Sequence, residues 1–274
     1  MDVQAHLRGA YERAAPTYDR AAFSHHAPFG ERLAQMVLLG PGGRVLDVGC
    51  GAGGALLPAA QRVGPTGEAV GIDVSEGMVE RTREAAAEAG IDWVRAEAMD
   101  AASLELPDES FDAVLCAFSL SSFADADGAL AEMRRVLRPT GTIGVAQWDA
   151  VIDSEWHWEG DLMGEFASQA PPELLAEVGR RSGRVAEAPR LHAVLKDAGF
   201  DDIKIDRSHV DRTYPSADAW WDWFRSGGAR AYVESLPEAA QEEFRERGLE
   251  RLRDASEYQR TRRFVAMLAV ARVA

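Results

Sequence analysis

VLDVGCGAGG, at residues 45–54, joins a short apolar run directly to a glycine-rich turn. With Arg44 before it, the run has the length and unbroken apolar character of a buried parallel strand over residues 44–48. Residues 52–63 follow with a helical pattern, which places the turn at a helix N-terminus. Glycines there let a ligand approach the backbone, and the helix N-terminus offers free N–H groups. A ligand site is therefore predicted at the carboxyl end of this strand.

The first half of the chain repeats this alternation of strand and helix. Four more short apolar runs predict buried strands at residues 69–73, 93–96, 113–117 and 142–147. Helical patterns at 76–89 and 125–137 stop at Gly90 and before Pro139. Strands that alternate with helices form βαβ units, so we expect a parallel sheet with helices on its faces.

Beyond residue 149 the alternation stops. Helices are expected at 172–182 and 189–198, a strand at 202–210, and a mainly helical stretch from Pro215 to residue 256. The apolar run FVAMLAVARV at 264–273 fits a helix or a central strand equally well. Periodicity alone does not separate these two structures in a short apolar run.

The composition limits the partners. The 274 residues include 30 Lys plus Arg against 45 Asp plus Glu, a net charge of −15. This charge opposes phosphate backbones and anionic membranes, so we expect neither nucleic acid nor a membrane as partner. Two cysteines are too few for a disulfide framework or a structural zinc site, and no metal is expected. We expect a cytoplasmic protein, a monomer or a homodimer, with a small-molecule acceptor.

Two cofactors fit the glycine-rich turn. Gly49, Gly51 and Gly54 satisfy the G-x-G-x-x-G pattern of dinucleotide-binding proteins, and Asp73 follows Gly51 by 73 − 51 = 22 residues. Asp47, just before the turn, instead favours S-adenosyl-L-methionine (SAM), because a carboxylate repels a pyrophosphate and attracts an ammonium and a sulfonium. An NAD(P)-dependent oxidoreductase stays the alternative. Its short-chain subclass is excluded, because neither of the two lysines has a tyrosine four residues before it.

The sequence resembles the class I SAM-dependent methyltransferases in several motifs. VLDVGCGAGG is similar to their first motif, and GIDVS at 71–75 with Met78 is similar to their second. Asp100-Ala101 with LELPDESFD at 104–112, and LRPTGT at 137–142, resemble the small-molecule branch that includes the ubiquinone and menaquinone methyltransferases. These motifs cover residues 41–148 in the family's order and spacing, and the rest of the chain carries few of them.

The resemblance implies an α/β fold. Its doubly wound, seven-stranded, Rossmann-like sheet has the order 3-2-1-4-5-7-6, and residues 264–273 would form the antiparallel last strand. The chain would divide into an N-terminal helical lid (1–40) and a SAM-binding core (41–149). Helical cap insertions that bind the acceptor would occupy 150–188 and 211–260, with the remainder of the core sheet at 189–210 and 261–274.

The family's cofactor residues carry over to this chain one by one. The resemblance places Asp73 at the two ribose hydroxyls, where a carboxylate forms stronger hydrogen bonds than a neutral residue. It places Asp100 at the adenine amino group, Val74 and Met78 beside the adenine ring, and Tyr18 in a lid near the methyl donor. The remaining SAM contacts that it implies are Asp47, Gly49, Gly51, Gly53, Ala101, Cys116 and Ala117.

The expected reaction is in-line attack of an O, N or C atom of a small, aromatic or apolar acceptor on the methyl carbon of SAM. Such a transfer depends mainly on positioning and on exclusion of water. Flat apolar acceptors suit aromatic walls, although packing within a helical cap explains the tryptophans equally well. The expected acceptor contacts are Phe118, Ser121, Trp148, Trp156 and Trp158.

The candidate catalytic residues are His157, His25 and Tyr18, which could take a proton from the acceptor. A surface or packing role is the simpler interpretation of each histidine, because the sequence shows no geometry. Many relatives carry a His pair after strand four where this chain has Ser121-Ser122, so no specific base carries over. A SAM-binding protein that does not methylate, such as a cyclase or a scaffold, is the alternative function.

Overall fold

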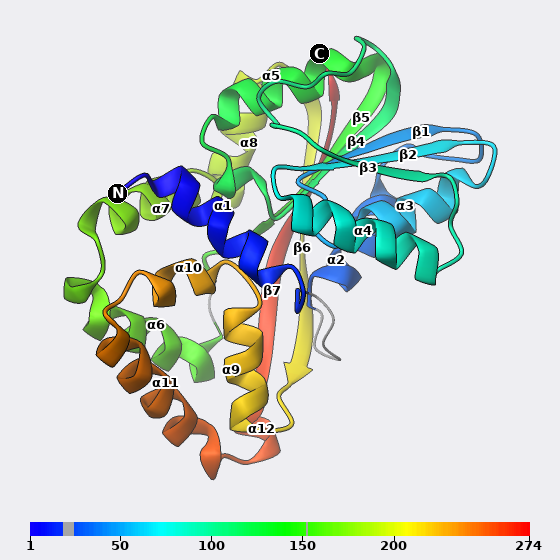
Figure 1. Cartoon of the computed structure of the whole chain (residues 1–274). Helices are drawn as coiled ribbons and strands as arrows, with labels where there is room; N and C mark the ends of the chain where they lie inside the picture. The colour runs from blue at the N-terminus through cyan, green and yellow to red at the C-terminus, as the bar shows by residue number, and fades with distance from the viewer. Residues whose placement is uncertain (19–24, 152) are drawn as a thin grey trace.

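The computed structural model describes residues 1–18, 25–151 and 153–274, and its centre is a seven-stranded sheet (Figure 1). The order β3-β2-β1-β4-β5-β7-β6 confirms the expected one. Neighbours from β3 to β5 pair in parallel, whereas β7 is antiparallel to both β5 and β6. The strands are β1 (Arg44–Val48), β2 (Glu68–Asp73), β3 (Val94–Ala98), β4 (Phe111–Ala117), β5 (Leu137–Trp148), β6 (Phe200–Thr213) and β7 (Thr261–Val273).

Helices cover both faces of the sheet, so the expected doubly wound α/β class is confirmed. On one face, α2 (His26–Met36) and α3 (Leu56–Val63) bury their leucines against the strands. On the other face, α5 (Ala126–Val136) and α8 (Ala188–Asp197) do the same. A further helix, α4 (Glu76–Glu88), packs along β2 and β3. Because both faces are covered, most residues of β1, β2 and β4 are buried.

The structure corrects one expected helix start, and it decides between the helix and the strand that periodicity left open for residues 264–273. The helix expected from residue 52 begins only at Leu56, because Gly51 and Gly53 precede it with φ angles of 54° and 84°, which no α-helix contains. The run at 264–273 lies within β7, which pairs with β5 on one edge and with β6 on the other. Two partner strands satisfy its backbone, so the run is a central strand and not a helix.

The second half of the chain adds a helical cap with its own core. Trp220 and Phe244 are fully buried at the centre of this core. Figure 1 shows that β6 and β7 extend from the sheet to the cap and carry it. The cap consists of α6 (His157–Phe166), α7 (Pro172–Val185), α9 (Ala217–Arg225), α10 (Ala229–Glu234), α11 (Glu238–Arg253) and α12 (Glu257–Arg260).

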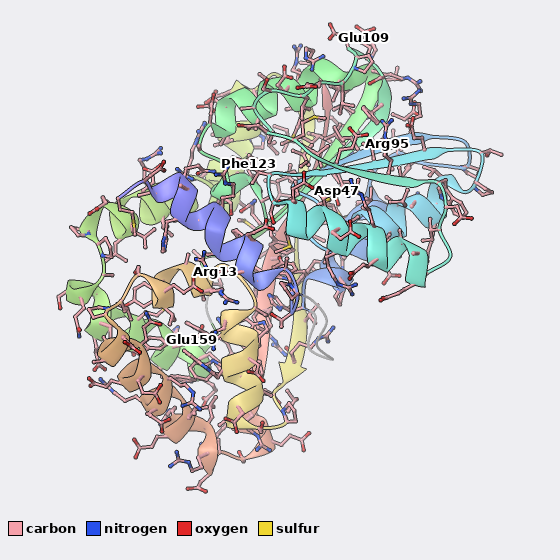
Figure 2. All side chains as sticks on the ribbon, viewed as in Figure 1. Arg13, Asp47, Arg95, Glu109, Phe123 and Glu159 are labelled. Atoms are coloured by element: carbon pink, nitrogen blue, oxygen red, sulfur yellow. The ribbon has the colours of Figure 1, made fainter. Side chains whose placement is uncertain are left out.

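A buried ion pair fixes the cap on β7. Glu159, labelled within the cap in Figure 2, accepts a hydrogen bond from Arg262 Nη1 at 2.7 Å and one from Trp220 Nε1 at 2.9 Å. A buried carboxylate is tolerated only when its oxygens are paired in this way. The pair therefore holds α6 and α9 at a defined position over the end of the sheet.

Helix α1 (Val3–Ala14) lies between the sheet and the cap (Figure 1). At one end, Glu12 accepts hydrogen bonds from Ser75 Oγ at 2.5 Å and from Gly77 N at 3.1 Å, both at the start of α4. His6 Nε2 lies 2.8 Å from the carbonyl oxygen of Ala231 in α10. Contacts on both sides let α1 close one wall of a site. Residues 19–24 of the expected lid lie outside the described residues.

Among the described residues, no helix combines the length and the apolar character needed to span a membrane. In the same part of the chain, no group of three or more His, Cys, Asp or Glu side chains is placed to hold a metal ion.

Candidate cofactor and acceptor site

A cavity of about 1030 Å³ lies at the carboxyl ends of β1, β2 and β4. Its lining includes the glycine-rich turn, α1 and parts of the cap helices α7, α9 and α10. Open α/β sheets bind their ligands at this edge. Small-molecule pockets typically measure about 300–1,000 Å³, so this cavity has room for a nucleoside cofactor and a second molecule.

The turn after β1 presents bare backbone to this cavity. Gly49 and Gly51 both line it and have φ angles of 74° and 54°, a region that favours glycine. A Cβ on Gly49 would lie 2.5 Å from the Cβ of Ser119, whose Oγ donates to the Gly49 carbonyl at 2.9 Å. Gly53, with a φ of 84°, shapes the turn but is not among the described lining residues. Glycine is therefore required at these positions by the backbone conformation, and at Gly49 also by the close approach of Ser119.

Asp73, at the end of β2, is held by the turn itself. Its Oδ2 accepts from Gly51 N and its Oδ1 from Ser75 N, each at 3.0 Å. Burial raises the pKa of Asp73, and these backbone hydrogen bonds partly oppose the rise. A carboxylate has about four acceptor positions, so each oxygen retains capacity for another donor. Two neighbouring hydroxyl groups are the ligand that this geometry suits.

Asp47 is the most unusual charge in the site. It lines the cavity from β1, is 1% exposed, and has no hydrogen-bond partner on Oδ1 among the described residues. Burial, with the nearby Asp73 charge, raises the pKa of Asp47 to about 7. Figure 2 shows Asp47 where the sheet faces α1. A buried carboxylate without a cation is costly, so the site suits a ligand with a positive charge and repels a pyrophosphate.

The other expected cofactor residues fall into two groups. Cys116 is fully buried within β4 and is not among the described lining residues. The contact expected there was one between the backbone around Cys116 and SAM, and Ala117 brings that backbone to the cavity. The expected residues that do line the cavity are Tyr18, Val74, Met78, Asp100, Ala101 and Ala117.

Aromatic rings form the wall opposite the turn. Phe118 follows β4 with a φ of 63°, uncommon for a non-glycine residue, and its ring stacks on Trp148 with centroids 4.1 Å apart. The His25 ring stacks on Phe264 at 4.3 Å, and Trp223 Nε1 donates to His25 Nδ1 at 3.0 Å. All of these residues line the cavity, and so does the expected Ser121. The wall offers a flat apolar surface to an acceptor.

The structure does not bring His157, Trp156 or Trp158 to this wall, which corrects the expectation for them. None of the three is among the described residues that line the cavity. Trp156 is 1% exposed and donates through Nε1 to the carbonyl of Thr261 at 2.8 Å. Trp158 packs between Trp156 and Trp220. Their rings fill the core of the cap, and His157 begins α6.

Several lining residues were missed by sequence reasoning. Arg181 comes from α7, and no local motif marks it. Arg262 and Phe264 are different, because residues two apart in a strand share a face. The strand expected at residues 264–273 did not reach Arg262, so the shared face of these two residues was not anticipated.

Comparison with known proteins places the chain in a family. Residues 45–141 match the family described as "Methyltransferase domain". The chain is 34% identical over 244 residues to the nocamycin O-methyltransferase of Saccharothrix syringae, with 82% of each protein covered. It is 40% identical over 134 residues to the aklanonic acid methyltransferase of Streptomyces sp. (strain C5), which covers 49% of this chain and 61% of that protein.

Solved structures give the same fold. The YcgJ protein of Bacillus subtilis superposes with a TM-score of 0.59 at 20% identity, over 91% of this chain and 99% of that one. The sheet order, the cavity edge and the relatives together define a methyltransferase of small-molecule type. The chain belongs to the class I SAM-dependent methyltransferases, and its cofactor is S-adenosyl-L-methionine. The resemblance in the motifs of the first half is thereby confirmed.

Proposed function

We propose that this enzyme transfers the methyl group of SAM to an oxygen atom of a small, mainly apolar acceptor. The observation that carries the proposal is the continuity of one cavity. The same space contains the glycine-rich turn with Asp47 and Asp73, and the aromatic wall with Trp148 and Phe264. A cofactor on the turn and an acceptor on the wall would therefore share one enclosure.

The residues of the turn fit SAM. Asp73 has acceptor capacity for the two ribose hydroxyls, and Asp47 offers an unpaired carboxylate oxygen to the amino group. Met78 and Val74 line the cavity beside Asp73, in the position proposed for the adenine ring. When bound, SAM supplies a methyl group made electrophilic by a sulfonium.

The chain's own contribution is positioning and exclusion of water. The aromatic wall orients a flat acceptor, and α1 with the cap shields the reacting atoms from solvent. Correct alignment and desolvation account for large rate enhancements without a catalytic triad. Tyr18 contributes to this enclosure, since its ring stacks on His26 at 5.8 Å within the lining.

His25 is better suited to orient the acceptor than to remove its proton. An indole N–H only donates, so the hydrogen bond from Trp223 requires His25 Nδ1 to accept, which leaves the ring proton on Nε2. A second proton on the ring would have to bind at Nδ1, and it would break the hydrogen bond from Trp223. The lone pair of Nδ1 is thus engaged by Trp223, so His25 serves the acceptor site through its ring, which stacks on Phe264 in the wall.

Two observations support oxygen as the methylated atom. One relative, matched over 82% of its length, is named an O-methyltransferase. A second relative is named for an acid as its substrate. Apolar rings on the aromatic wall suit the carbon skeleton of such a molecule.

Transfer of a labelled methyl group tests this proposal. SAM with a 13C-labelled methyl is incubated with the enzyme and a set of aromatic hydroxy and carboxylic acids, with Asp73→Ala as the inactive control. The 13C chemical shift of the product separates O-methyl from N-methyl and C-methyl groups. We expect O-methyl products only. Label on nitrogen or carbon, or conversion of an acceptor without consumption of SAM, would contradict the proposal.

A further inference from the structure

Arg181 is a buried cation in the lining of the cavity. It lies on α7, is 9% exposed and is one of the lining residues. Buried arginines are rarely found without partners that satisfy their charge. The partners of this side chain therefore show which part of it is available to a ligand.

The protein uses three of the five guanidinium N–H groups. Nε donates to Glu177 Oε1 at 2.6 Å, and Nη1 donates to Gln4 Oε1 at 2.8 Å and to the Ser122 carbonyl at 3.0 Å. A guanidinium has one N–H on Nε and two on each terminal nitrogen. Both N–H groups of Nη2 therefore remain without an acceptor in the described part of the chain.

The charge of Arg181 is only partly compensated. Glu177 is its ion-pair partner, and the same carboxylate also accepts two hydrogen bonds from Arg180, at 2.7 and 3.0 Å. Together the two guanidinium groups lower the pKa of Glu177 to about 2. One carboxylate thus serves two cations, which leaves this cluster with a net positive charge. A cavity ligand with a negative charge would balance it.

Arg181 is tied to the elements that enclose the reacting atoms. Ser122 belongs to the segment that follows β4, whose end lines the cofactor side of the cavity. Gln4 belongs to α1, the helix that closes the cavity. The three bonds hold the guanidinium in place, so an anion bound at Nη2 would meet a preorganised donor.

We propose that Arg181 anchors a carboxylate of the acceptor through Nη2 and thereby selects acidic acceptors over neutral ones. This role rests on the proposed function, because it assigns the acceptor to the same cavity. It adds a substrate class: a flat, apolar molecule that bears a carboxylate. The two N–H groups on one nitrogen offer charge-assisted hydrogen bonds, which are stronger than bonds between neutral groups.

Paired probes test this role at equilibrium. Benzoate, 1-naphthoate and anthracene-9-carboxylate are each titrated into protein saturated with S-adenosylhomocysteine, beside the matching methyl ester, which keeps the rings and lacks the charge. Tryptophan fluorescence reports binding, because Trp148 and Trp223 line the cavity. We expect the best-bound acid to bind about tenfold to a hundredfold more tightly than its ester, as a charge-assisted hydrogen bond allows.

Variants on the same helix assign the preference to one residue. Arg181→Gln should reduce the acid-to-ester affinity ratio to near one, and Arg181→Lys should retain part of it, since lysine keeps the charge without the fork. Arg180→Gln is the matched control: its guanidinium binds the same Glu177 but is 62% exposed and is not among the described lining residues. Its ratio should equal that of the wild type. A general loosening of the cap cancels in the ratio.

The outcomes separate this role from the proposed function. Equal binding of acid and ester by the wild type, no detectable binding of any acid, or an unchanged ratio in Arg181→Gln would overturn the role of Arg181. Affinity for S-adenosylhomocysteine is measured on the same samples. Absence of S-adenosylhomocysteine binding in the wild type would contradict the proposed function. Normal S-adenosylhomocysteine affinity together with equal affinities for acid and ester would contradict the role of Arg181 alone.

Discussion

Replacement of Asp47 with Asn should make the cofactor-free protein relatively more stable as the pH rises. The pKa of the buried Asp47 is raised from 3.8 to about 7, so the folded state binds its proton more tightly than the unfolded state does. The contribution of Asp47 to the free energy of unfolding of the wild type is therefore largest at low pH, and it decreases as the pH rises past 7. Each pKa unit corresponds to about 1.4 kcal/mol, and pH 5 lies about two units below this pKa, so the loss between pH 5 and pH 8 is about 2.7 kcal/mol. An asparagine side chain does not titrate, so the Asp47→Asn variant lacks this loss of stability.

Urea unfolding at pH 5 and pH 8 measures the effect. The difference in free energy of unfolding, Asp47→Asn minus wild type, should increase by about 2.7 kcal/mol between the two values. A constant cost of burying the amide does not alter this change. Asp92→Asn, which replaces an exposed carboxylate, is the control for removal of one negative charge. Parallel pH dependence of wild type and Asp47→Asn would refute the reasoning. The same variant should bind SAM more weakly, since it removes the charge facing the cation.

Three further substitutions have expected outcomes. Asp73→Ala should weaken SAM binding about a hundredfold or more without unfolding the protein, because it removes two charge-assisted acceptors; calorimetric titration that shows unchanged affinity would contradict this. Gly49→Ala should destabilise the fold by more than about 1 kcal/mol, because its φ is 74° and the new Cβ would meet Ser119 at 2.5 Å. Stability in urea equal to the wild type would count against that geometry. Trp223→Phe removes the donor to His25 Nδ1 and should lower kcat/KM for the acceptor about fivefold with S-adenosylhomocysteine affinity unchanged; equal kcat/KM values would show that the bond has no role in catalysis.

The sheet and the cofactor half of the site could be predicted because their signals are local. The strand, the glycine-rich turn and Asp73 lie within one βαβ unit, so sequence spacing fixes their geometry. Periodicity alone did not decide whether residues 264–273 form a helix or a strand, since a buried strand and a buried helix are both apolar throughout. The family resemblance implied a strand there, and its pairing with β5 and β6, which are distant in sequence, confirms that strand.

The acceptor half could not be predicted in the same way. Arg181 meets Gln4 and Ser122 across 177 and 59 residues of sequence, and no spacing rule connects such positions. The tryptophans show the same limit: Trp148 lines the cavity whereas Trp156 fills the cap core, although both are aromatic residues outside the central helices. Tertiary packing of the cap, and not residue type, decides which rings face a ligand.

Parallel calorimetric titrations with SAM, S-adenosylhomocysteine and NADPH test the central claim most directly. We expect SAM and S-adenosylhomocysteine to bind at one site per chain and Asp73→Ala to weaken both interactions about a hundredfold or more. NADPH should give no heat of binding, because Asp47 repels its pyrophosphate. Binding of NADPH, or SAM affinity that is unchanged by the loss of Asp73, would contradict the assignment of this cavity to the methyl donor.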